Sequence, residues 1–386
     1  MFPRLLRLPK RGTLFLFGAR GVGKSTALKQ QFAVAETHVV NLLLPELEQR
    51  YALSPTTFAR EVASLPASIK RVVIDEVQKV PPLLDVVQHL IEDQKSPLQF
   101  VLTGSSARKL KSGSANLLAG RAAVHRMFPL FSEELGGAGD VEALLRFGSL
   151  PVILQYPTEA RDSYLRSYAT TYFKEEVAAE QLVRKIEPFR RFLPVAAQMS
   201  GEIINYSAIA QDVGVDVKTV QSYFSILEDT LLGFFLEPWH DSVRKRQRKA
   251  PKFLFFDTGV TRALAGQLKV TPSPSTSYFG QLFEQRVIQE IVHRNQTLEL
   301  DLQLGYLRTE KDVEIDLIIQ RPDGRKQLVE IKSTEHVRDK EARHLLAFEP
   351  LFPKAEFLLL SRDPRRQKLG KIRALPWEEG VVELAS

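Results

Sequence analysis

The 386-residue sequence predicts a multidomain α/β protein whose first domain is built on a parallel sheet. Three apolar runs predict this fold class. The run at 13–17 leads into a glycine-rich loop, the run at 71–74 ends in two acids, and the run at 98–102 ends in small polar residues. Such continuous runs are typical of strands buried on both faces of a parallel sheet. The length suggests roughly two to four domains.

The composition excludes several classes of protein. Apolar residues make up 44% and charged residues 26% of the chain, close to globular averages, so a large core is available. The absence of cysteine excludes disulfides and thiolate metal sites and suits a reducing, cytoplasmic setting. No stretch approaches the roughly 20 apolar residues of a membrane helix, so we expect a soluble protein without a membrane partner. The net charge of +7 favours a polyanionic partner.

The glycine-rich loop has the spacing G-x-x-x-x-G-K-[ST] between a strand and a helix-compatible stretch, which is the Walker A arrangement. Its glycines let backbone N–H groups wrap a β-phosphate, and the helix N-terminus adds a favourable dipole. We expect Lys24 to reach the β- and γ-phosphate oxygens of ATP and the Ser25 hydroxyl to bind Mg²⁺. The loop consists of Gly18, Ala19, Arg20, Gly21, Val22, Gly23, Lys24, Ser25 and Thr26.

The second apolar run, Arg71-Val-Val-Ile-Asp-Glu76, has the form of a Walker B motif. Asp75 is expected to hold the magnesium, usually through water, and Glu76 to position or deprotonate the attacking water. An acid pair at a strand end is common, but the neighbouring Walker A loop gives this pair a specific meaning. The two motifs together predict ATP hydrolysis.

Two further positions are candidates for the same site. In P-loop ATPases of the AAA+ group a polar residue at the end of the third run senses the γ-phosphate, and Thr103 or Ser105 would serve here; plain turn chemistry is the alternative. Arg121 is the candidate for an arginine finger that reaches the γ-phosphate bound by a neighbouring subunit. Arg108 and Arg126 compete for that role.

Beyond these motifs, the sequence resembles the prokaryotic AAA+-type ATPases that carry a characteristic, largely uncharacterised C-terminal region. The resemblance covers nearly the whole chain and implies an ATPase fold and a domain order. One departure is Ser149, where a second glycine is expected. The matching segments are GARGVGKST, VVIDEVQKVP, LTGSSARKL, LAGR…PLFSEE, FGSLPVIL, KAPKFLFFDTGVTRAL, VEIDLII and VEIKS.

A helix-turn-helix is predicted in the middle of the chain. Residues 207–213 are expected to form a short helix, Gly214 supplies a turn, and Asp216 can cap a second helix able to enter a DNA major groove. The expected buried stripe of that second helix contains Val217, Val220, Phe224 and Leu227. Apolar strands on either side of a loop complete a winged helix. The loop carries six basic residues from Arg244 to Lys252, which suit phosphate contacts with DNA. Winged helices also bind proteins, so that alternative stays open.

In the C-terminal region we expect a helix that opens at Gln281. It carries an acid, Glu284, on its apolar face, which is unfavourable unless the acid is paired or binds a cation. Two strands follow, and in the second Glu330 and Lys332 share a face because they are two residues apart. Asp316 on the first strand could face them. This order of residues resembles the PD-(D/E)XK nuclease fold, an α/β restriction-endonuclease-like domain.

The resemblance to this fold implies metal-assisted phosphodiester hydrolysis. Asp316 and Glu330 would bind Mg²⁺, with Glu284 in direct or indirect contact, and Lys332 would orient or deprotonate a water. Such folds also survive as inactive binding modules. In that case Glu314 and Lys332 could simply form cross-strand surface pairs.

These patterns predict four domains: an AAA+-like P-loop ATPase domain at 1–132, a helical connector at 133–195, a winged helix at 196–268 and a nuclease-like domain at 269–386. The leading hypothesis is an ATP-hydrolysing, DNA-processing protein that uses ATP and Mg²⁺ and forms a ring-like homo-oligomer if Arg121 acts in trans. One alternative is a DNA motor without cleavage activity. The other is an ATP-switched signalling or scaffold protein.

Overall fold

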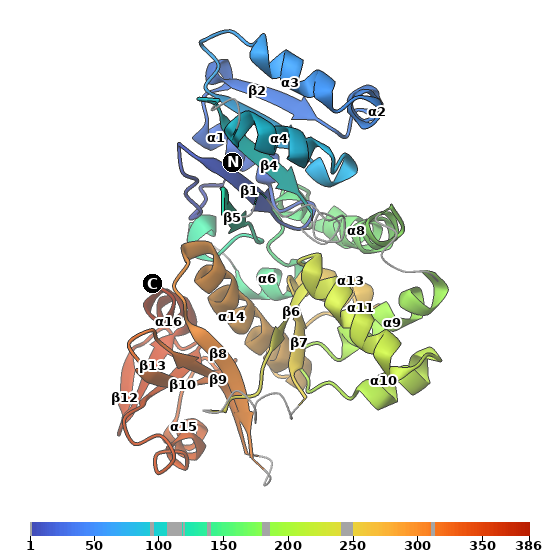
Figure 1. Ribbon diagram of the computed structural model, residues 1–386. Coiled ribbons are helices and arrows are strands. Elements are labelled where there is room, and N and C mark those ends of the chain that lie inside the picture. Colours follow the sequence, from blue (N-terminus) through green and yellow to red (C-terminus); the bar gives the residue numbers. More distant parts are fainter. Residues whose placement is uncertain are drawn as a thin grey trace. The chain divides into compact units, whose positions relative to one another are not determined.

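The computed structural model describes residues 2–92, 96–105, 118, 120–136, 140–179, 186–240, 250–309 and 313–386. The chain divides into two compact units. One unit contains Arg4–Phe128 together with Asp229–Leu232, and the other contains Pro129–Glu228 and Gly233–Ser386 with the first three residues. Figure 1 shows the elements of both units. No helix in the described part of the chain is long and apolar enough to span a membrane.

The first unit is built on a parallel five-stranded sheet, as the sequence predicts (Figure 1). The strands lie in the order β2-β3-β4-β1-β5, and every neighbouring pair is parallel. The carboxyl ends of β1, β3 and β4 therefore meet at one edge of the sheet. The strands are β1 (Thr13–Phe17), β2 (Thr37–Asn41), β3 (Arg71–Asp75), β4 (Gln99–Gly104) and β5 (Ala122–Arg126).

Helices pack against this sheet because their apolar residues recur at helical spacing. In α4, Leu83, Leu84, Val87 and Leu90 are buried and join alternate residues of β1, β3 and β4 in one core. The helices are α1 (Lys24–Gln31), α2 (Pro45–Leu53), α3 (Thr56–Ala63) and α4 (Leu83–Glu92), with short 3₁₀ helices η1 (Val34–Glu36) and η2 (Val77–Lys79).

The second unit contains a six-stranded mixed sheet in the order β12-β13-β11-β10-β9-β8 and a two-stranded antiparallel sheet, β6-β7. The strands are β6 (Gly233–Leu236), β7 (Lys252–Phe255), β8 (Gln303–Arg308), β9 (Glu314–Gln320), β10 (Lys326–Lys332), β11 (Glu356–Ser361), β12 (Gln367–Leu369) and β13 (Ile372–Pro376). Its helices are η3 (Glu133–Leu135), α6 (Val141–Phe147), α7 (Pro151–Leu154), α8 (Thr158–Ala179), α9 (Ile186–Gln198), α10 (Tyr206–Val213), α11 (Val217–Asp229), α13 (Thr258–Leu264), α14 (Ser277–Leu298), α15 (Asp339–Leu346) and α16 (Trp377–Leu384).

Alternation along the central strands gives the six-stranded sheet two apolar faces. In β10, Val329 and Ile331 pack with α14 and α16, whereas Leu328 packs with residues of α15 on the opposite face. Helix α14 begins at Ser277 and not at Gln281, where the sequence pattern placed its start. The side chain of Thr276 accepts a hydrogen bond from the N–H of Phe279 and so begins the helix four residues earlier.

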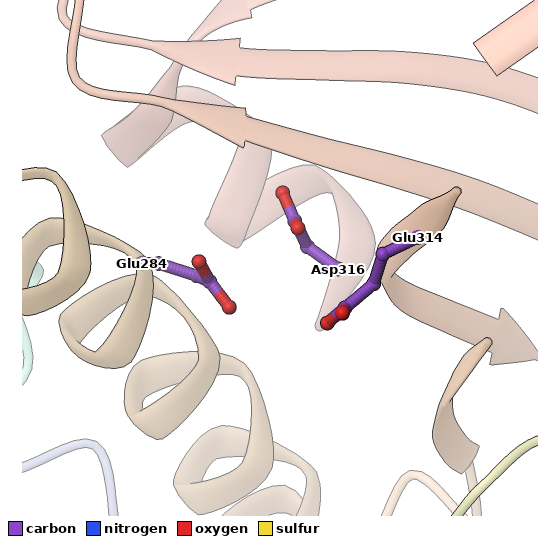
Figure 2. Close-up of side chains that lie close together, drawn as sticks. All are labelled: Glu284, Glu314 and Asp316. Atoms are coloured by element: carbon purple, nitrogen blue, oxygen red, sulfur yellow. The ribbon is translucent and has the colours of Figure 1, made fainter. Parts of the chain in front are cut away.

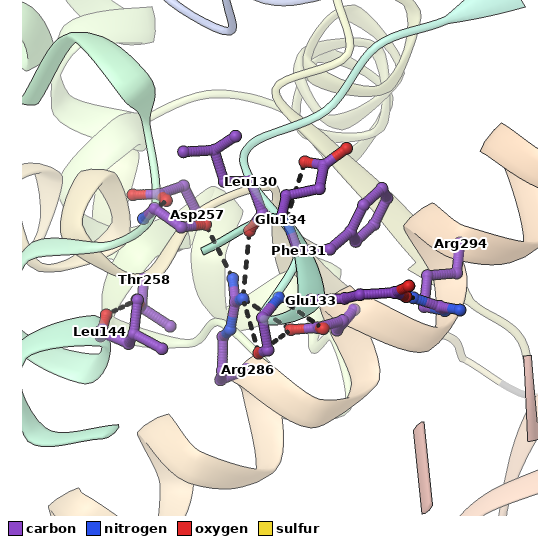
Figure 3. A network of polar contacts seen from close by, with 12 residues as sticks. Leu130, Phe131, Glu133, Glu134, Leu144, Asp257, Thr258, Arg286 and Arg294 are labelled. Atoms are coloured by element: carbon purple, nitrogen blue, oxygen red, sulfur yellow. Dashed lines mark hydrogen bonds and ion pairs between the residues drawn. The ribbon is translucent and has the colours of Figure 1, made fainter. Parts of the chain in front are cut away.

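A buried polar network ties α14 to segments that lie far away in the sequence (Figure 3). Arg286 donates to Ser149 Oγ at 2.8 Å and to Glu290 Oε2 at 2.6 Å. The N–H of Ser149 donates to Asp257 Oδ2 at 2.8 Å. Both the N–H and the hydroxyl of Ser132 donate to the Glu290 carboxylate at 2.8 Å. Ser149, unexpected from the family resemblance, thus contributes a hydroxyl that a glycine could not supply.

The helix pair of the middle segment forms at the predicted positions, α10 and α11. The N–H of Thr219 donates to Asp216 Oδ1 at 2.8 Å and caps α11. Lys218 on this helix is exposed. Val217, which the helical pattern assigned to the buried stripe, is 37% exposed because it precedes the first buried turn. Tyr223 takes its place in the stripe beside Phe224.

Candidate nucleotide site and acid pocket

The glycine-rich loop joins β1 to α1 in a conformation that requires glycine. Gly21 and Gly23 have φ of 83° and 94°, in the left-handed region. A Cβ on Gly18 would lie 2.5 Å from the carbonyl oxygen of Met127. The ammonium of Lys24 is buried at the start of α1 and donates to the carbonyl of Gly18 at 2.7 Å. The first turn of α1 contains no acid, which favours an anion at this helix end.

Polar groups from the loop, β3 and β4 meet at the edge of the sheet. The Ser25 hydroxyl lies 3.3 Å from Asp75 Oδ2, and Thr103 Oγ1 donates to Asp75 Oδ1. A hydroxyl beside a carboxylate is the oxygen donor set that Mg²⁺ prefers, so these residues fit a magnesium ion. Thr103 is fully buried and faces Asp75. The residues Ala19, Arg20, Val22 and Thr26 complete the loop, with Arg20 and Thr26 exposed.

Glu76 is held from two sides at this edge. Its Oε1 lies 3.9 Å from Lys24 Nζ, and Gln78 Nε2 donates to its Oε2 at 2.5 Å. The same Gln78 amide lies 3.1 Å from Ser105 Oγ, at the end of β4. Glu76 itself has φ of 62°, an uncommon conformation for a residue with a side chain. The sequence interpretation missed Gln78, whose only signal is its position two residues after the acid pair.

Two of the three candidate arginines, Arg121 and Arg126, lie in the described part of the chain. The guanidinium of Arg121 pairs with Glu92 of the same chain, and its side chain is 41% exposed. Arg126 ends β5 and is exposed. Arg108 lies outside the described residues. A role for Arg121 on a neighbouring subunit stays a prediction.

In the second unit, Glu284 of α14 and Glu314 and Asp316 of β9 gather at one place (Figure 2). One oxygen from each carboxylate lies within 4.8 Å of the others. Together with Glu330 and Lys332 they line a pocket of about 580 Å³. The four positions predicted from the nuclease fold are Glu284, Asp316, Glu330 and Lys332, and all four line this pocket.

The strand geometry explains how β9 and β10 present these groups. Their antiparallel pairing ends at Val329 and Leu317, and beyond that point Asp316 Oδ2 accepts the N–H of Ile331 at 2.7 Å. The Asp316 carboxylate thus accepts a hydrogen bond of the kind that a backbone carbonyl accepts where two strands are paired. Glu330 is buried and pairs with Lys332 on the same strand face.

His344 from α15 joins the pocket beside Glu330, with its Nε2 2.9 Å from Glu330 Oε2. That oxygen is buried and receives no hydrogen bond of good geometry from the described residues. An oxygen of this kind suits a bound cation, because a buried acceptor that receives no well-directed hydrogen bond is unfavourable. The carboxylates of the pocket therefore fit a hard divalent ion such as Mg²⁺.

Lys252 enters the pocket from β7. Its Nζ lies 3.5 Å from Glu284 Oε1 and also pairs with Glu314. The sequence interpretation assigned Lys252 to an exposed basic loop, and that assignment is wrong because the residue is only 5% exposed. It begins a strand flanked by apolar residues, so its side chain turns inward. The other five basic residues of the run, at 244–249, lie outside the described residues.

The pKa values of Asp316, Glu284 and Lys332 in this pocket are all raised from their usual ranges. Burial raises the pKa of Asp316 well above its usual range, and the carboxylates of Glu284 and Glu330 raise it further. Burial also raises the pKa of Glu284, against the effect of Lys252. Burial lowers the pKa of Lys332, but Asp316 and Glu330 more than offset this and raise it overall. Strongly perturbed groups in a pocket are typical of functional sites.

Glu314, Lys252 and His344 take part in the charged contacts of the pocket, although the sequence interpretation did not assign them to the site. Glu314 lies two residues before Asp316, so its place on the same strand face was predictable from the period of a strand. Lys252 and His344 belong to other elements of the fold. No spacing in the sequence connects them with the acids.

Comparison with known families agrees with the geometry of the first unit. Residues 10–136 match the family described as an AAA domain. This part of the chain is a P-loop ATPase domain of the AAA type. The predicted ATPase fold is thereby confirmed, and such a domain uses ATP with Mg²⁺. Residues 138–271 and 279–379 match two families, each described as a domain of unknown function (DUF8612 and DUF4143).

Related proteins extend over most of the chain. An uncharacterized protein of Mycobacterium tuberculosis is 26% identical over 334 residues, which are 85% of this chain and 71% of the relative. An uncharacterized protein of Haemophilus influenzae is 23% identical, covering 79% of both chains. Among solved structures, a Walker-type ATPase of Pyrococcus abyssi is similar with a TM-score of 0.43 and 15% identity, covering 65% of this chain and 90% of that one.

Proposed function

We propose that this protein hydrolyses ATP in its AAA-type unit and acts on DNA with its second unit. The observation that carries the proposal is the meeting of Lys24, Ser25, Asp75 and Glu76 at the carboxyl edge of one parallel sheet. Ligands bind at this edge in α/β sheets. The four side chains supply a phosphate-binding cation, two magnesium ligands and a base.

The ATP reaction follows from these positions. The backbone of the loop and Lys24 bind and orient the phosphates, while Ser25 and Asp75 would hold Mg²⁺. The ion, when bound, neutralises charge that develops on the phosphates during transfer. Glu76 accepts or directs the proton of the attacking water from its place 3.9 Å from Lys24.

ATP turnover in Glu76→Gln tests this part of the proposal. The variant should bind ATP normally and hydrolyse it at least about a hundredfold more slowly, because it keeps shape but loses the base. Lys24→Ala should lose nucleotide affinity or turnover. Unchanged turnover in Glu76→Gln would refute the role of Glu76.

The proposal for DNA rests on the middle and C-terminal parts of the second unit. The order of elements supports a winged helix, because the helix pair α10 and α11 is followed by the two antiparallel strands β6 and β7. The helix α11 exposes Lys218, Gln221 and Ser222. The basic segment at 244–249 would bind phosphates and not read bases.

The acid pocket extends the proposal to phosphodiester cleavage. Asp316 and Glu330 would hold a divalent ion, with Glu284 in direct or indirect contact, and Lys332 would orient the water. The variant Asp316→Ala tests this on supercoiled and branched DNA with Mg²⁺ or Mn²⁺. Cleavage by the wild type that the variant lacks is expected. Equal absence of cleavage in both, with every metal, would end the nuclease proposal.

A second candidate function is a DNA motor that grips duplex without cutting it. The ion pairs of Lys252 with Glu284 and Glu314 favour this candidate, because an ammonium group already neutralises part of the pocket. ATP-dependent strand or junction movement without cleavage would support the motor. If no nucleic acid binds at low salt, an ATP-switched scaffold protein becomes the better interpretation.

A further inference from the structure

Lys252 is a buried lysine whose charged partners are acids from other elements of the fold. It belongs to β7 in the two-stranded sheet, whereas Glu284 lies on α14 and Glu314 on β9. The ammonium nitrogen contacts both carboxylates and lies 5.3 Å from the centre of the Tyr306 ring. These contacts occupy two of the three carboxylates that gather in the pocket.

The backbone around Lys252 is held on both sides. On one side Lys252 pairs with Leu236 of β6, and on the other it forms an isolated bridge with Ile203. The neighbouring carbonyl of Ala250 accepts the Tyr306 hydroxyl at 2.6 Å. The ammonium is therefore aimed at the acids by a fixed strand, although its four-carbon stem can still swing.

We infer that Lys252 is the resident cation of the acid pocket and occupies the charge position that a divalent ion would take, so that loading a metal requires its ammonium group to leave Glu284 and Glu314. The inference rests on the proposed metal-dependent function of this pocket. It gives Lys252 of β7, which is not part of the nuclease-like motif, an effect on metal binding in the pocket.

The physical reason is competition within one cluster of carboxylates, because Glu284 is common to the two cations and an oxygen of Asp316 lies within 4.8 Å of oxygens of both acids that Lys252 contacts. An ammonium and a divalent ion within this cluster repel each other at such short range. Without either cation, Glu284, Glu314 and Asp316 would repel one another. Lys252 thus stabilises the metal-free pocket and weakens metal binding by the same contacts.

Binding of Mn²⁺ to the full-length protein, followed by calorimetry and by the electron paramagnetic resonance of free Mn²⁺, tests the inference. Lys252→Met should bind Mn²⁺ at least about tenfold more tightly than the wild type, because the competing charge is gone. Lys252→Arg retains the charge and should bind no more tightly than the wild type. Lys340→Met removes a charge that lines the same pocket and should change affinity far less.

Thermal unfolding with and without Mn²⁺ covers the case in which Lys252→Met is unstable. Loss of the counter-charge should lower the melting temperature without metal, and Mn²⁺ should raise it more than in the wild type. If Mn²⁺ does not stabilise this variant, the inference is wrong.

The outcomes separate this inference from the proposed function. If the wild type binds Mn²⁺ and Lys252→Met binds it no more tightly, the inference is wrong but the proposed metal site stands. If neither protein binds Mn²⁺, both the inference and the proposed metal site fail, while the ATPase proposal is unaffected.

Discussion

At the scale of single residues, the contact between Gln78 and Glu76 has the clearest consequence for turnover. The Gln78 amide is buried, reaches both Glu76 and Ser105, and packs against Gly104, where a Cβ would lie 2.6 Å from its oxygen. A base on a backbone with positive φ needs such support, because its own conformation is unfavourable. We therefore regard Gln78 as a positioning residue for Glu76.

Gln78→Leu keeps the volume and removes the hydrogen bonds. We expect kcat for ATP hydrolysis to fall roughly tenfold or more, with KM nearly unchanged, because the phosphate-binding loop is untouched. Steady-state kinetics measures both constants. Gln88→Leu, on helix α4, is the matched control and should leave them unaltered. An unchanged kcat in Gln78→Leu would show that the contact is only structural.

Asp316 gives a prediction about pH and stability. Its pKa is raised in the folded protein by burial and by Glu284 and Glu330, so folding becomes less favourable as pH rises from about 4 through the folded pKa. Asp316→Asn should therefore raise the melting temperature of the metal-free protein at neutral pH. The increase should be roughly 2–4 °C for each kcal/mol gained in the free energy of unfolding. The gain should vanish near pH 4.

Scanning calorimetry at several pH values checks this prediction. Asp323→Asn is the control, since Arg325 holds the pKa of Asp323 below its usual range and its removal should bring no gain. A variant Asp316→Asn that is less stable than the wild type at neutral pH would contradict the assignment of Asp316 as a destabilising functional group.

At the scale of elements, glycine turns decide how α6 and α13 pack. Gly148 has φ of 72°, and a Cβ on it would lie 2.0 Å from Asp257 Oδ1. The chain cannot accommodate this, because the Asp257 carboxylate also accepts the N–H groups of Ser149 and Val260. The matching segment that begins at Phe147 therefore has a structural role, because its turn packs against Asp257 in the second unit.

Gly148→Ala should destabilise the second unit by about 2–4 kcal/mol, through both the clash and the positive φ. Urea unfolding followed by circular dichroism measures the change. Gly136→Ala, with φ of 78° and nothing within 4 Å, isolates the backbone strain and should lose only about 1–2 kcal/mol. Equal destabilisation in the two variants would show that the contact with Asp257 is unimportant.

Much of the fold could be predicted from the sequence, because local patterns determine it. The order of strand, loop and helix at the P-loop, the acids ending β3 and the shared face of Glu330 and Lys332 all depend on neighbours within a few residues. Lys252 and His344 could not be predicted, since their elements approach the acids only in the folded unit. Lys252 is buried and not exposed as expected for the same reason.

At the scale of the whole molecule, the sequence combines a nucleotide-binding unit with a second unit whose predicted basic segment suits DNA. The net charge of +7 is modest for 386 residues, so a local concentration of charge matters more than the total. Five of the basic residues lie at 244–249. Lys252 is excluded from this set because it is buried.

Replacing Arg244, Lys245, Arg246 and Arg248 with glutamine tests the segment. The slope of log affinity against log salt for duplex DNA should decrease by about 0.9 for each phosphate that the protein no longer neutralises. Fluorescence anisotropy at several salt concentrations gives this slope. A slope equal to that of the wild type would place the DNA-binding surface elsewhere on the protein.

The proposed function is tested most sharply by ATP turnover with single-stranded, duplex and junction DNA at low salt, with cleavage followed in the same reactions. We expect at least one form of DNA to raise turnover in the wild type, and Glu76→Gln to stay inactive with all of them. Turnover that is the same with and without every nucleic acid tested would contradict a DNA-processing ATPase.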